Sequence, residues 1–258
     1  AAVDGYVWLH RAAFTCAADL CEGRPTDRFL GYCLHRVALL RQHGVTPVLV
    51  FDGGRLPSKS GEEESRHKSR RANLEKARQH AAQGNRAAAY ECYAKAVDVS
   101  PRMAAQLIRA LRREGVEYCV APYEADAQMA YLCHGGAVDL VITEDSDLTA
   151  LACKTVLYKL DRDGNGVEIR YEDLGRNRPL DFTGFTPQRF LEMCVLSGCD
   201  YLGSVQGFGL KKAHGLMRRY HSYEKAVKIM RFEGSHVPRG YEEQFRRALL
   251  TFAHQWVW

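Results

Sequence analysis

Short apolar runs and amphipathic segments alternate along the first two thirds of the chain. The runs Val45–Phe51 and Val138–Thr143 predict buried strands, and Ala1–Val3 is interpreted as the end of another strand. Further strands are expected at Val116–Ala121 and Thr155–Leu160. Strands that are separated by helices predict a parallel sheet with helices on both faces. The expected fold class is therefore α/β, with a central, mainly parallel sheet.

Helical periodicity fills the intervals between these strands. In Asp27–His43 an apolar face is expected, and its members are Phe29, Cys33, Val37 and Leu40. Pro101 opens a helix whose inner residues are expected to be Met103, Leu107, Ile108 and Leu111. From about Thr186 onward the pattern is helical. The remaining helices are predicted at Ser60–Gln83, Arg86–Val97, Glu124–Cys133, Phe190–Leu196, Leu210–Tyr220, Ser222–Met230 and Tyr241–His254.

Acidic residues follow the predicted strands. They are Asp4, Asp52, Glu124, Asp126, Asp145 and Asp147, and Asp200 comes after Gly198-Cys199 in the helical half. The carboxyl ends of parallel strands share one edge of a sheet, so these acids are expected to converge there. Clustered carboxylates repel one another unless cations neutralise them, and hard oxygen ligands favour Mg²⁺ or Mn²⁺ over zinc. Two such ions roughly 4 Å apart activate water against a phosphodiester.

Each acid also has a structural alternative when it is considered alone. Asp52 can make a turn, and Glu124 can favour a helix N-terminus through the helix dipole. A second metal motif competes as well, because Asp161–Gly166 with Glu172 satisfies the formal EF-hand pattern. A strand-like segment precedes it, however, and Gly164-Asn165-Gly166 is typical of a turn. We therefore predict a β-hairpin at this position.

The distribution of charge and the cysteine content indicate which kind of partner the protein binds and in which cellular compartment it is found. The net charge is only +5, but residues 55–78 carry eight lysines and arginines against four acidic residues. This local basic surface favours a polyanionic partner, although a solvated helix face is the structural alternative. Nine cysteines without a framework spacing favour reduced thiols and a cytosolic or nuclear location. No apolar run approaches the roughly 20 residues that span a bilayer, so no membrane association is expected.

Five segments then indicate a family. They are VDGYVWLH (3–10), VLVFDGGRLPSK (48–59), APYEADAQMAYL (121–132), ITEDSDLTA (142–150) and LSGCDYLGSVQGFGLKKA (196–213). In this order they resemble the signature blocks of the flap endonuclease superfamily. YEADAQ, ANLEKARQ and the C-terminal FRRALLTFAHQ resemble its exonuclease branch most.

The resemblance implies roles for individual residues. The metal ligands of the family match Asp4, Asp52, Glu124, Asp126, Asp145, Asp147 and Asp200. Lys59 and Arg66 match the catalytic lysine and arginine that grip the scissile phosphate, with solvated charges as the alternative. Tyr6 and His10 match positions beside the terminal nucleotide. A core role is the alternative for Tyr6, and Trp8 is assigned to the core.

The helical half implies a second DNA contact. Gly207-Phe208-Gly209 before a basic helix resembles the helix–two-turn–helix of the family, in which Gly207, Gly209, Lys211 and Lys212 contact DNA. Backbone carbonyls of Ser204 and Phe208 would hold K⁺ there. The cofactors implied are therefore two Mg²⁺ ions, for which Mn²⁺ can substitute, and K⁺.

One nuclease domain over residues 1–258 is the expected organisation. It comprises an α/β metal-binding core at 1–53 and 115–195, a helical arch at 54–114, and the helix–two-turn–helix with C-terminal helices at 196–258. Family members begin with a Met-Gly segment that contributes to the strand ending at Asp4. The resemblance therefore leads us to expect an N-terminal truncation, and a missing C-terminal tail that binds repair partners.

The function implied by the resemblance is hydrolysis of phosphodiesters near the 5′ ends of duplex DNA. This activity comprises 5′→3′ exonuclease and 5′-flap endonuclease reactions, in nuclear DNA repair that includes mismatch repair. The expected partner is double-stranded DNA with 5′ ends, nicks, gaps or flaps, and the protein is expected to be a monomer. Two alternatives remain open at this point: a flap or junction endonuclease of the same superfamily, and a non-catalytic module that binds DNA structures.

Overall fold

The computed structural model describes residues 1–59 and 64–258 with their side chains, and residues 60–63 by their backbone alone. The chain divides into two compact units. Unit 1 comprises Ala1–Ala125, Ile142–Glu144 and Lys159–Gly166, and unit 2 comprises Asp126–Val141, Asp145–Tyr158 and Val167–Trp258.

The strands form one six-stranded sheet in the order β3-β2-β1-β4-β5-β6. Their bounds are β1 Ala2–Asp4, β2 Val48–Phe51, β3 Glu117–Val120, β4 Val141–Thr143, β5 Thr155–Tyr158 and β6 Val167–Arg170. The first three strands are parallel, with Val3 opposite Leu49 and Leu49 opposite Tyr118. Strand β6 is antiparallel to its neighbour, β5. These pairings confirm the predicted α/β class with a mainly parallel sheet.

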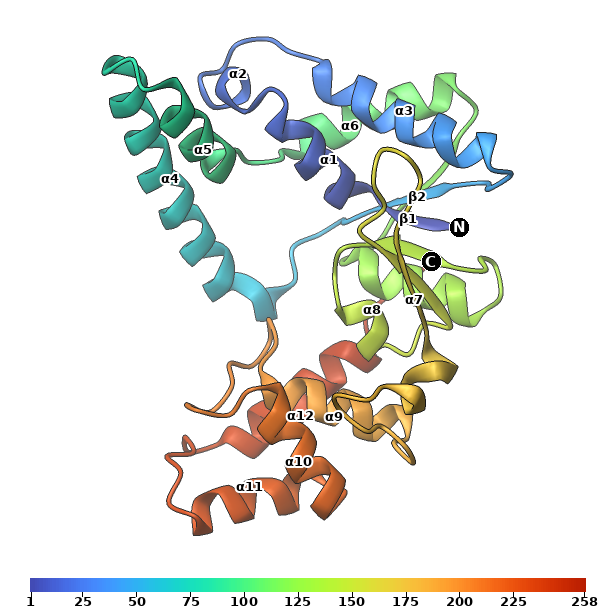
Figure 1. Cartoon of the computed structure of the whole chain (residues 1–258), viewed down its shortest axis with the longest axis vertical. Coiled ribbons are helices and arrows are strands. Elements are labelled where there is room, and N and C mark those ends of the chain that lie inside the picture. Colours follow the sequence, from blue (N-terminus) through green and yellow to red (C-terminus); the bar gives the residue numbers. More distant parts are fainter. The chain divides into compact units, whose positions relative to one another are not determined.

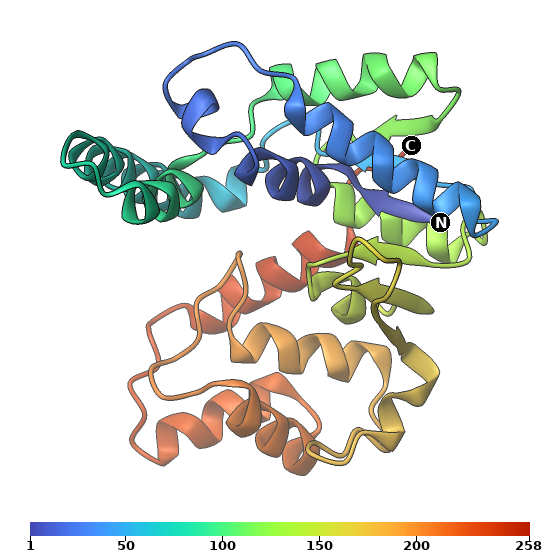
Figure 2. The same cartoon turned by 45° about the horizontal axis from the view of Figure 1, so that its top comes forward.

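In unit 1, three helices pack against one another beside β1 and β2 (Figures 1 and 2). They are α1 Gly5–Phe14, α3 Arg28–Gln42 and α6 Pro101–Arg113, and the short α2 Ala17–Cys21 lies between α1 and α3 in the chain. The predicted apolar face of α3 is buried at all four positions. Trp8 is buried too, which confirms its assignment to the core.

A long helical hairpin follows β2 in unit 1. A 3-10 turn, η1 Pro57–Lys59, leads into α4 Ser60–Ala82, which lies beside α5 Arg86–Ala96 in both views (Figures 1 and 2). Side chains 64–69 of α4 are exposed, whereas Ala77 in its second half is fully buried. The two ends of this helix therefore have different surroundings. We call α4 and α5 together the α4–α5 hairpin.

Unit 2 is mainly helical. Its elements besides the strands are α7 Ala125–His134, whose first residue belongs to unit 1, α8 Asp147–Ala150, η2 Tyr171–Arg176, α9 Pro187–Ser197, α10 Leu210–Tyr220, α11 Tyr223–Phe232 and α12 Tyr241–Ala253. Helix α9 contacts α8, α10, α11 and α12, and its Val195 and Leu196 are fully buried in their shared core. Among the described residues no helix is long and apolar enough to cross a membrane.

The EF-hand alternative is excluded by the elements around it. Strands β5 and β6 pair with Val156 opposite Ile169, so the expected hairpin is confirmed. In the connecting loop, the Asp161 carboxylate accepts the backbone N–H groups of Asp163 and Asn165 at 2.8 and 2.9 Å. The acid that would open a calcium loop is therefore engaged in closing the turn.

Candidate functional site

Asp4 occupies the junction between β1 and α1 in unit 1. Its Oδ1 accepts the backbone N–H of Val7 at 3.0 Å, which caps α1, and its Oδ2 accepts the Thr143 hydroxyl at 3.4 Å. The residue is only 7% exposed. A buried carboxylate with fixed orientation is suited to a defined ligand role, and it also contributes to the helix start. The two roles are compatible, because a carboxylate oxygen that accepts one hydrogen bond keeps a second lone pair for a cation.

Asp52 lies at the end of β2, where the chain approaches the segment after β3. Its Oδ1 accepts the backbone N–H of Ala125 at 2.7 Å. The next residue, Gly53, donates its N–H to the Tyr123 carbonyl at 2.7 Å, and a Cβ there would lie 1.9 Å from the Ala121 carbonyl oxygen. Only glycine permits this approach. Asp52 thus caps the start of α7 in addition to following a strand.

Lys59 and Glu124 form an ion pair in unit 1, with side-chain exposures of 20% and 14%. Lys59 ends η1, immediately before α4, and Glu124 precedes α7. The pair joins the start of the α4–α5 hairpin to the segment that follows β3. In the structure, Lys59, which is predicted to bind phosphate, therefore contacts Glu124, which is predicted to bind a metal.

Tyr6 and His10 lie on α1 in an environment of mixed charge. The Tyr6 ring packs edge-on against the Phe51 ring, with 6.2 Å between the ring centroids. Burial raises the Tyr6 pKa, and the charges of Asp52 and Asp98 raise it further. Burial is also the main cause that lowers the His10 pKa, and the charges of Arg70 and Arg66 lower it further. Burial and the charges of two arginines of α4 thus disfavour the charged form of His10.

The carboxylates of unit 2 form the clearest candidate metal centre. Oxygens of Asp126, Asp145 and Asp147 lie within 4.8 Å of one another, and all three residues are partly buried. Asp126 lies in the first turn of α7, Asp145 follows β4, and Asp147 begins α8. A donor set made only of carboxylate oxygens fits Mg²⁺ or Mn²⁺, whereas zinc sites favour sulfur and nitrogen.

Asp200 lies beside a pair of cysteines in unit 2. The pKa of the Cys199 thiol is raised by burial first, and the charges of both Asp147 and Asp200 contribute. Burial raises the Cys194 pKa to about 12, with a further contribution from Asp147. Both aspartates are thus close enough to influence Cys199. Among the described side chains, however, Asp200 is not within the three-carboxylate cluster.

The segment 198–209, where the helix–two-turn–helix is predicted, joins α9 to α10 and contains two turns, the first of which is closed by a bridge between Cys199 and Leu202. Gly207 has a φ of 78°, which favours glycine, and Gly209 is the N-cap residue of α10. Lys211 and Lys212 are exposed on the first turn of that helix, and the Lys212 ammonium lies 4.9 Å from the centre of the Phe208 ring. Backbone N–H groups at a helix start and two exposed cations make a favourable environment for phosphate.

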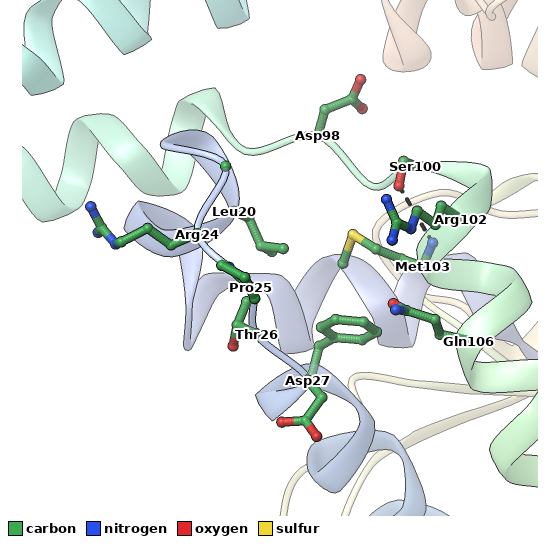
Figure 3. Close-up of a pocket in the computed structure, with 12 residues that line it drawn as sticks. Leu20, Arg24, Pro25, Thr26, Asp27, Asp98, Ser100, Arg102, Met103 and Gln106 are labelled. Atoms are coloured by element: carbon green, nitrogen blue, oxygen red, sulfur yellow. Dashed lines mark hydrogen bonds between the residues drawn. The ribbon is translucent and has the colours of Figure 1, made fainter.

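One cavity of unit 1 lies outside the predicted site. Its volume is about 720 Å³, and it lies between the segment after α2 and the start of α6 (Figure 3). Leu20 and Met103 contribute apolar surface, and Asp98 and Arg102 contribute charge. The residues that line it are different from those of the predicted site.

Three residues of the site region were not identified from the sequence. Thr143 donates to Asp4, and Arg70 and Asp98 act on His10 and pair with each other at 2.6 Å. Arg70 lies one helical turn after Arg66, so the basic segment contained a signal for it. Asp98 follows a helix in a polar connection, where nothing in the sequence distinguishes it from a solvated acid.

Comparison with known families identifies the class of protein. The model of the XPG N-terminal domain matches residues 1–73, and that of the XPG I-region matches residues 115–200. The chain therefore belongs to the XPG family, which confirms the resemblance to flap endonucleases.

Among individual relatives, the chain is similar to exonuclease 1. It is 53% identical over 257 residues to exonuclease 1 of Arabidopsis thaliana, covering 100% of this chain and 35% of that protein. Exonuclease 1 of Oryza sativa subsp. japonica is 52% identical over 257 residues, with 100% and 31% covered. The chain thus spans about a third of the length of these relatives.

Solved structures support the fold. The catalytic core of Rad2 in complex with DNA substrate aligns with a TM-score of 0.63 at 22% identity, over 99% of this chain and 72% of that one. Flap endonuclease-1 from Methanococcus jannaschii gives 0.61 at 21% identity, over 95% and 76%. GEN1 in complex with product DNA and Mg²⁺ gives 0.61 at 18% identity, over 100% and 57%.

Proposed function

We propose that this chain carries the catalytic part of a divalent-metal-dependent, structure-specific DNA nuclease. It would hydrolyse phosphodiesters at or near 5′ ends of duplex DNA, as a 5′→3′ exonuclease that also cuts 5′ flaps. The observation that carries the proposal is the convergence of Asp126, Asp145 and Asp147 within 4.8 Å. The names of the relatives, exonuclease 1 above all, support the choice of reaction.

Two groups of carboxylates would hold two Mg²⁺ ions, with Mn²⁺ as a substitute. Asp126, Asp145 and Asp147 would hold one ion with Asp200 nearby. Asp4, Asp52 and Glu124 offer ligands for the other. Bound metal supplies an activated water and stabilises the charge on the phosphoryl oxygens. The solved complex of GEN1 with product DNA contains Mg²⁺, which supports this choice of ion.

The remaining side chains bind and orient DNA. The Lys59 ammonium, held at Glu124, is placed to exchange that partner for a phosphate oxygen and to stabilise developing negative charge. Arg66 would add a second cation from α4. Tyr6 and His10 offer ring faces for a base at the DNA end. These groups address phosphates and ring faces, so they favour recognition of DNA structure over sequence.

The turn before α10 would bind duplex at a second point. Gly207, Gly209, Lys211 and Lys212 would hold a backbone phosphate, and carbonyls of Ser204 and Phe208 would hold K⁺. We further propose that the protein acts as a monomer in nuclear DNA repair, including mismatch repair. Repair partners would bind outside this domain, which comprises the core, arch and helical regions expected from the sequence.

Cleavage of an end-labelled duplex tests this proposal. The substrate has a 3′ overhang and a label at the recessed 5′ end, and the protein is incubated with Mg²⁺ or with a chelator. We expect mono- or short oligonucleotides to be released from the 5′ end only with Mg²⁺. Asp147→Ala should abolish release while duplex binding is largely retained, and Asp139→Asn, at an exposed acid outside the cluster, should behave as wild type.

Two other outcomes would change the assignment. Efficient cutting of long 5′ flaps or junctions without attack on a recessed end would favour a flap or junction endonuclease. Binding without metal-dependent turnover would contradict catalysis and favour a module that only binds DNA structures. The cluster of carboxylates argues against that module, because concentrated negative charge weakens phosphate binding.

A further inference from the structure

Glu22 connects both helices of the α4–α5 hairpin to α2. Arg78 of α4 donates from Nε and Nη2 to the two carboxylate oxygens of Glu22, at 3.0 and 3.1 Å. The Tyr93 hydroxyl of α5 donates to Oε1 of the same carboxylate at 2.9 Å. Glu22 immediately follows α2, so a single side chain links three helices of unit 1.

The geometry makes this contact stronger than an ordinary surface ion pair. Isolated exposed pairs contribute little, but bidentate arginine–carboxylate pairs fix both direction and distance. Only 8% of Tyr93 is exposed, so its side chain is packed within unit 1. The hydrogen bonds of Arg78, and then of Tyr93, lower the Glu22 pKa, which is consistent with a stabilised carboxylate. The Cys21 thiol adds a weak contact to the Tyr93 carbonyl at 3.8 Å.

Three residues from the middle of α4 onward fix this helix to its surroundings. Besides Arg78, they are Ala77, which is fully buried, and Arg70, which pairs with Asp98 at 2.6 Å. The proposed phosphate-binding Arg66 lies in the exposed first part of the helix. At 1.5 Å per residue, Arg66 is about 18 Å along the helix axis from Arg78.

A change in the tilt of α4 near Arg78 is therefore amplified at Arg66. Where the partly exposed Arg70–Asp98 pair yields as well, a tilt of roughly 5° at Arg78 over about 18 Å of helix would displace Arg66 by about 1.5 Å. A misplacement of about 1 Å in a catalytic group can cost on the order of 10²-fold in rate. A small loosening at Glu22 would thus have a large effect at the other end of the helix.

We propose that Glu22 is a positioning residue, which holds the α4–α5 hairpin so that Arg66 and Lys59 reach the scissile phosphate. The inference rests on the proposed function, because it requires those two cations to act on DNA. Glu22 acts through Arg78 and Tyr93 and has no part in binding metal or DNA. Its contribution is therefore to the rate of the chemical step and not to the affinity for duplex.

Glu22→Gln is the informative substitution. Glutamine keeps the length and an acceptor for Tyr93, but it removes the charge that holds Arg78. Amide hydrogen exchange in residues 64–82 should become roughly tenfold faster, since a charge-assisted hydrogen bond is removed. On a 5′-labelled duplex, kcat should fall by roughly 10- to 100-fold, with less than about a twofold change in duplex Kd.

Two further variants separate positioning from stability. Asp19→Asn removes a single-contact ion pair of similar exposure, with Arg24 at 2.7 Å, that lies at α2 and involves no residue of the hairpin, and it should change neither measurement. The charge swap Glu22→Arg with Arg78→Glu re-forms the pair in reverse, and Tyr93 can then accept in place of donating. This double variant should recover most of kcat and of the exchange protection.

The proposal has definite ways to fail. Unchanged exchange in the hairpin of Glu22→Gln would overturn it, and so would faster exchange with an unchanged kcat. Equal losses in Glu22→Gln and Asp19→Asn would indicate general destabilisation and would also overturn it. A wild-type protein without nuclease activity would refute the proposed function separately, because exchange is measured without DNA.

Discussion

The backbone N–H of Asp147 donates to Oδ1 of Asp145 at 3.0 Å, so the chain turns these two carboxylates toward a shared position in unit 2. Asp126 adds a third carboxylate, and oxygens of all three lie within 4.8 Å of one another. Like charges at this spacing oppose folding unless a cation compensates them. The arrangement therefore stabilises a bound metal at the expense of the metal-free fold.

Neutralising one member of this cluster should separate stability from metal binding. Asp145→Asn retains an acceptor for the Asp147 N–H but removes a charge. Without Mg²⁺ we expect Tm to rise by ~2–4 °C, which corresponds to about 1 kcal/mol for a protein of this size. The rise in Tm that Mg²⁺ produces in the wild type should largely disappear. Thermal melts with and without Mg²⁺ measure both effects.

Asp139→Asn is the matched control, because Asp139 is exposed and outside the cluster. It should leave both melting temperatures near those of the wild type. A wild type whose Tm does not respond to Mg²⁺, or an Asp145→Asn variant with an undiminished response, would contradict a metal centre at this position.

The close approach of the chain at Gly53, next to Asp52, leads to a second prediction, which concerns the stability of the fold. A Cβ at this residue would lie 1.9 Å from the Ala121 carbonyl oxygen, so Gly53→Ala must push the two segments apart. We expect a loss of about 1–3 kcal/mol in the free energy of unfolding. Urea denaturation, read as a change in the midpoint at constant slope, measures it.

Gly31→Ala is the control for the same chemical change. Gly31 lies in α3 with nothing within 4 Å of its Cβ position. Alanine there should stabilise the protein by about 0.5–1 kcal/mol, because glycine is the poorer helix former. Equal effects of the two substitutions would show that the close approach at Gly53 does not constrain the fold.

Much of the fold followed from hydrophobic periodicity alone. The apolar face of α3 and the bounds of α10 agree with the structure, since long periodic segments carry a strong signal. Strand lengths were overestimated. The segment Val45–Phe51 is a strand only from Val48, because Pro47 has no N–H to donate to a neighbouring strand. Apolar character identifies a buried run but not where its pairing begins.

The positions of the acidic residues in the candidate site could be predicted from the sequence better than the contacts that hold its basic residues. Asp126, Asp145 and Asp147 converge because parallel strands present their ends at one edge, which topology alone implies. The contacts of Glu22 with Arg78 and Tyr93 were not predictable, because they join residues 56 and 71 positions apart. Nothing in local sequence fixes the angle at which a polar helical hairpin leaves the core.

His10 makes stability depend on pH. Its folded-state pKa is lowered, first by burial and then by Arg70 and Arg66, against an ordinary value of 6.5. Asp98 opposes this effect by raising the pKa. The pKa of His10 is lower in the folded state than in the unfolded state. The contribution of His10 to the free energy of unfolding is therefore fully present above about pH 6.5, and it is lost as pH falls through the folded-state pKa.

We therefore expect the Tm of the wild type to fall between pH 7 and pH 5 more steeply than that of His10→Phe. Phenylalanine keeps a ring on α1 but cannot titrate. His67→Gln, at an exposed position of α4, serves as the control and should retain the wild-type slope. Parallel slopes for the wild type and His10→Phe would show that His10 is not held neutral by its surroundings.

The first turn of α10 should govern affinity for duplex without governing cleavage. Lys211 and Lys212 are exposed beside the Gly209 N-terminus of the helix, where phosphate binding is favoured. Replacing both by alanine should weaken duplex binding and reduce the slope of log K against log salt by about 1–2, roughly 0.9 for each phosphate that is no longer neutralised. At saturating DNA, kcat should stay within about twofold of the wild type, because the proposed contacts to the reacting phosphate are those of Lys59 and Arg66. Lys225→Ala, an exposed lysine on α11, controls for the loss of surface charge. The α10 variant lacks two lysines, so its decrease in slope is divided by two for comparison with Lys225→Ala. Equal decreases per lysine would contradict a phosphate site on α10, because general electrostatic attraction would then account for binding.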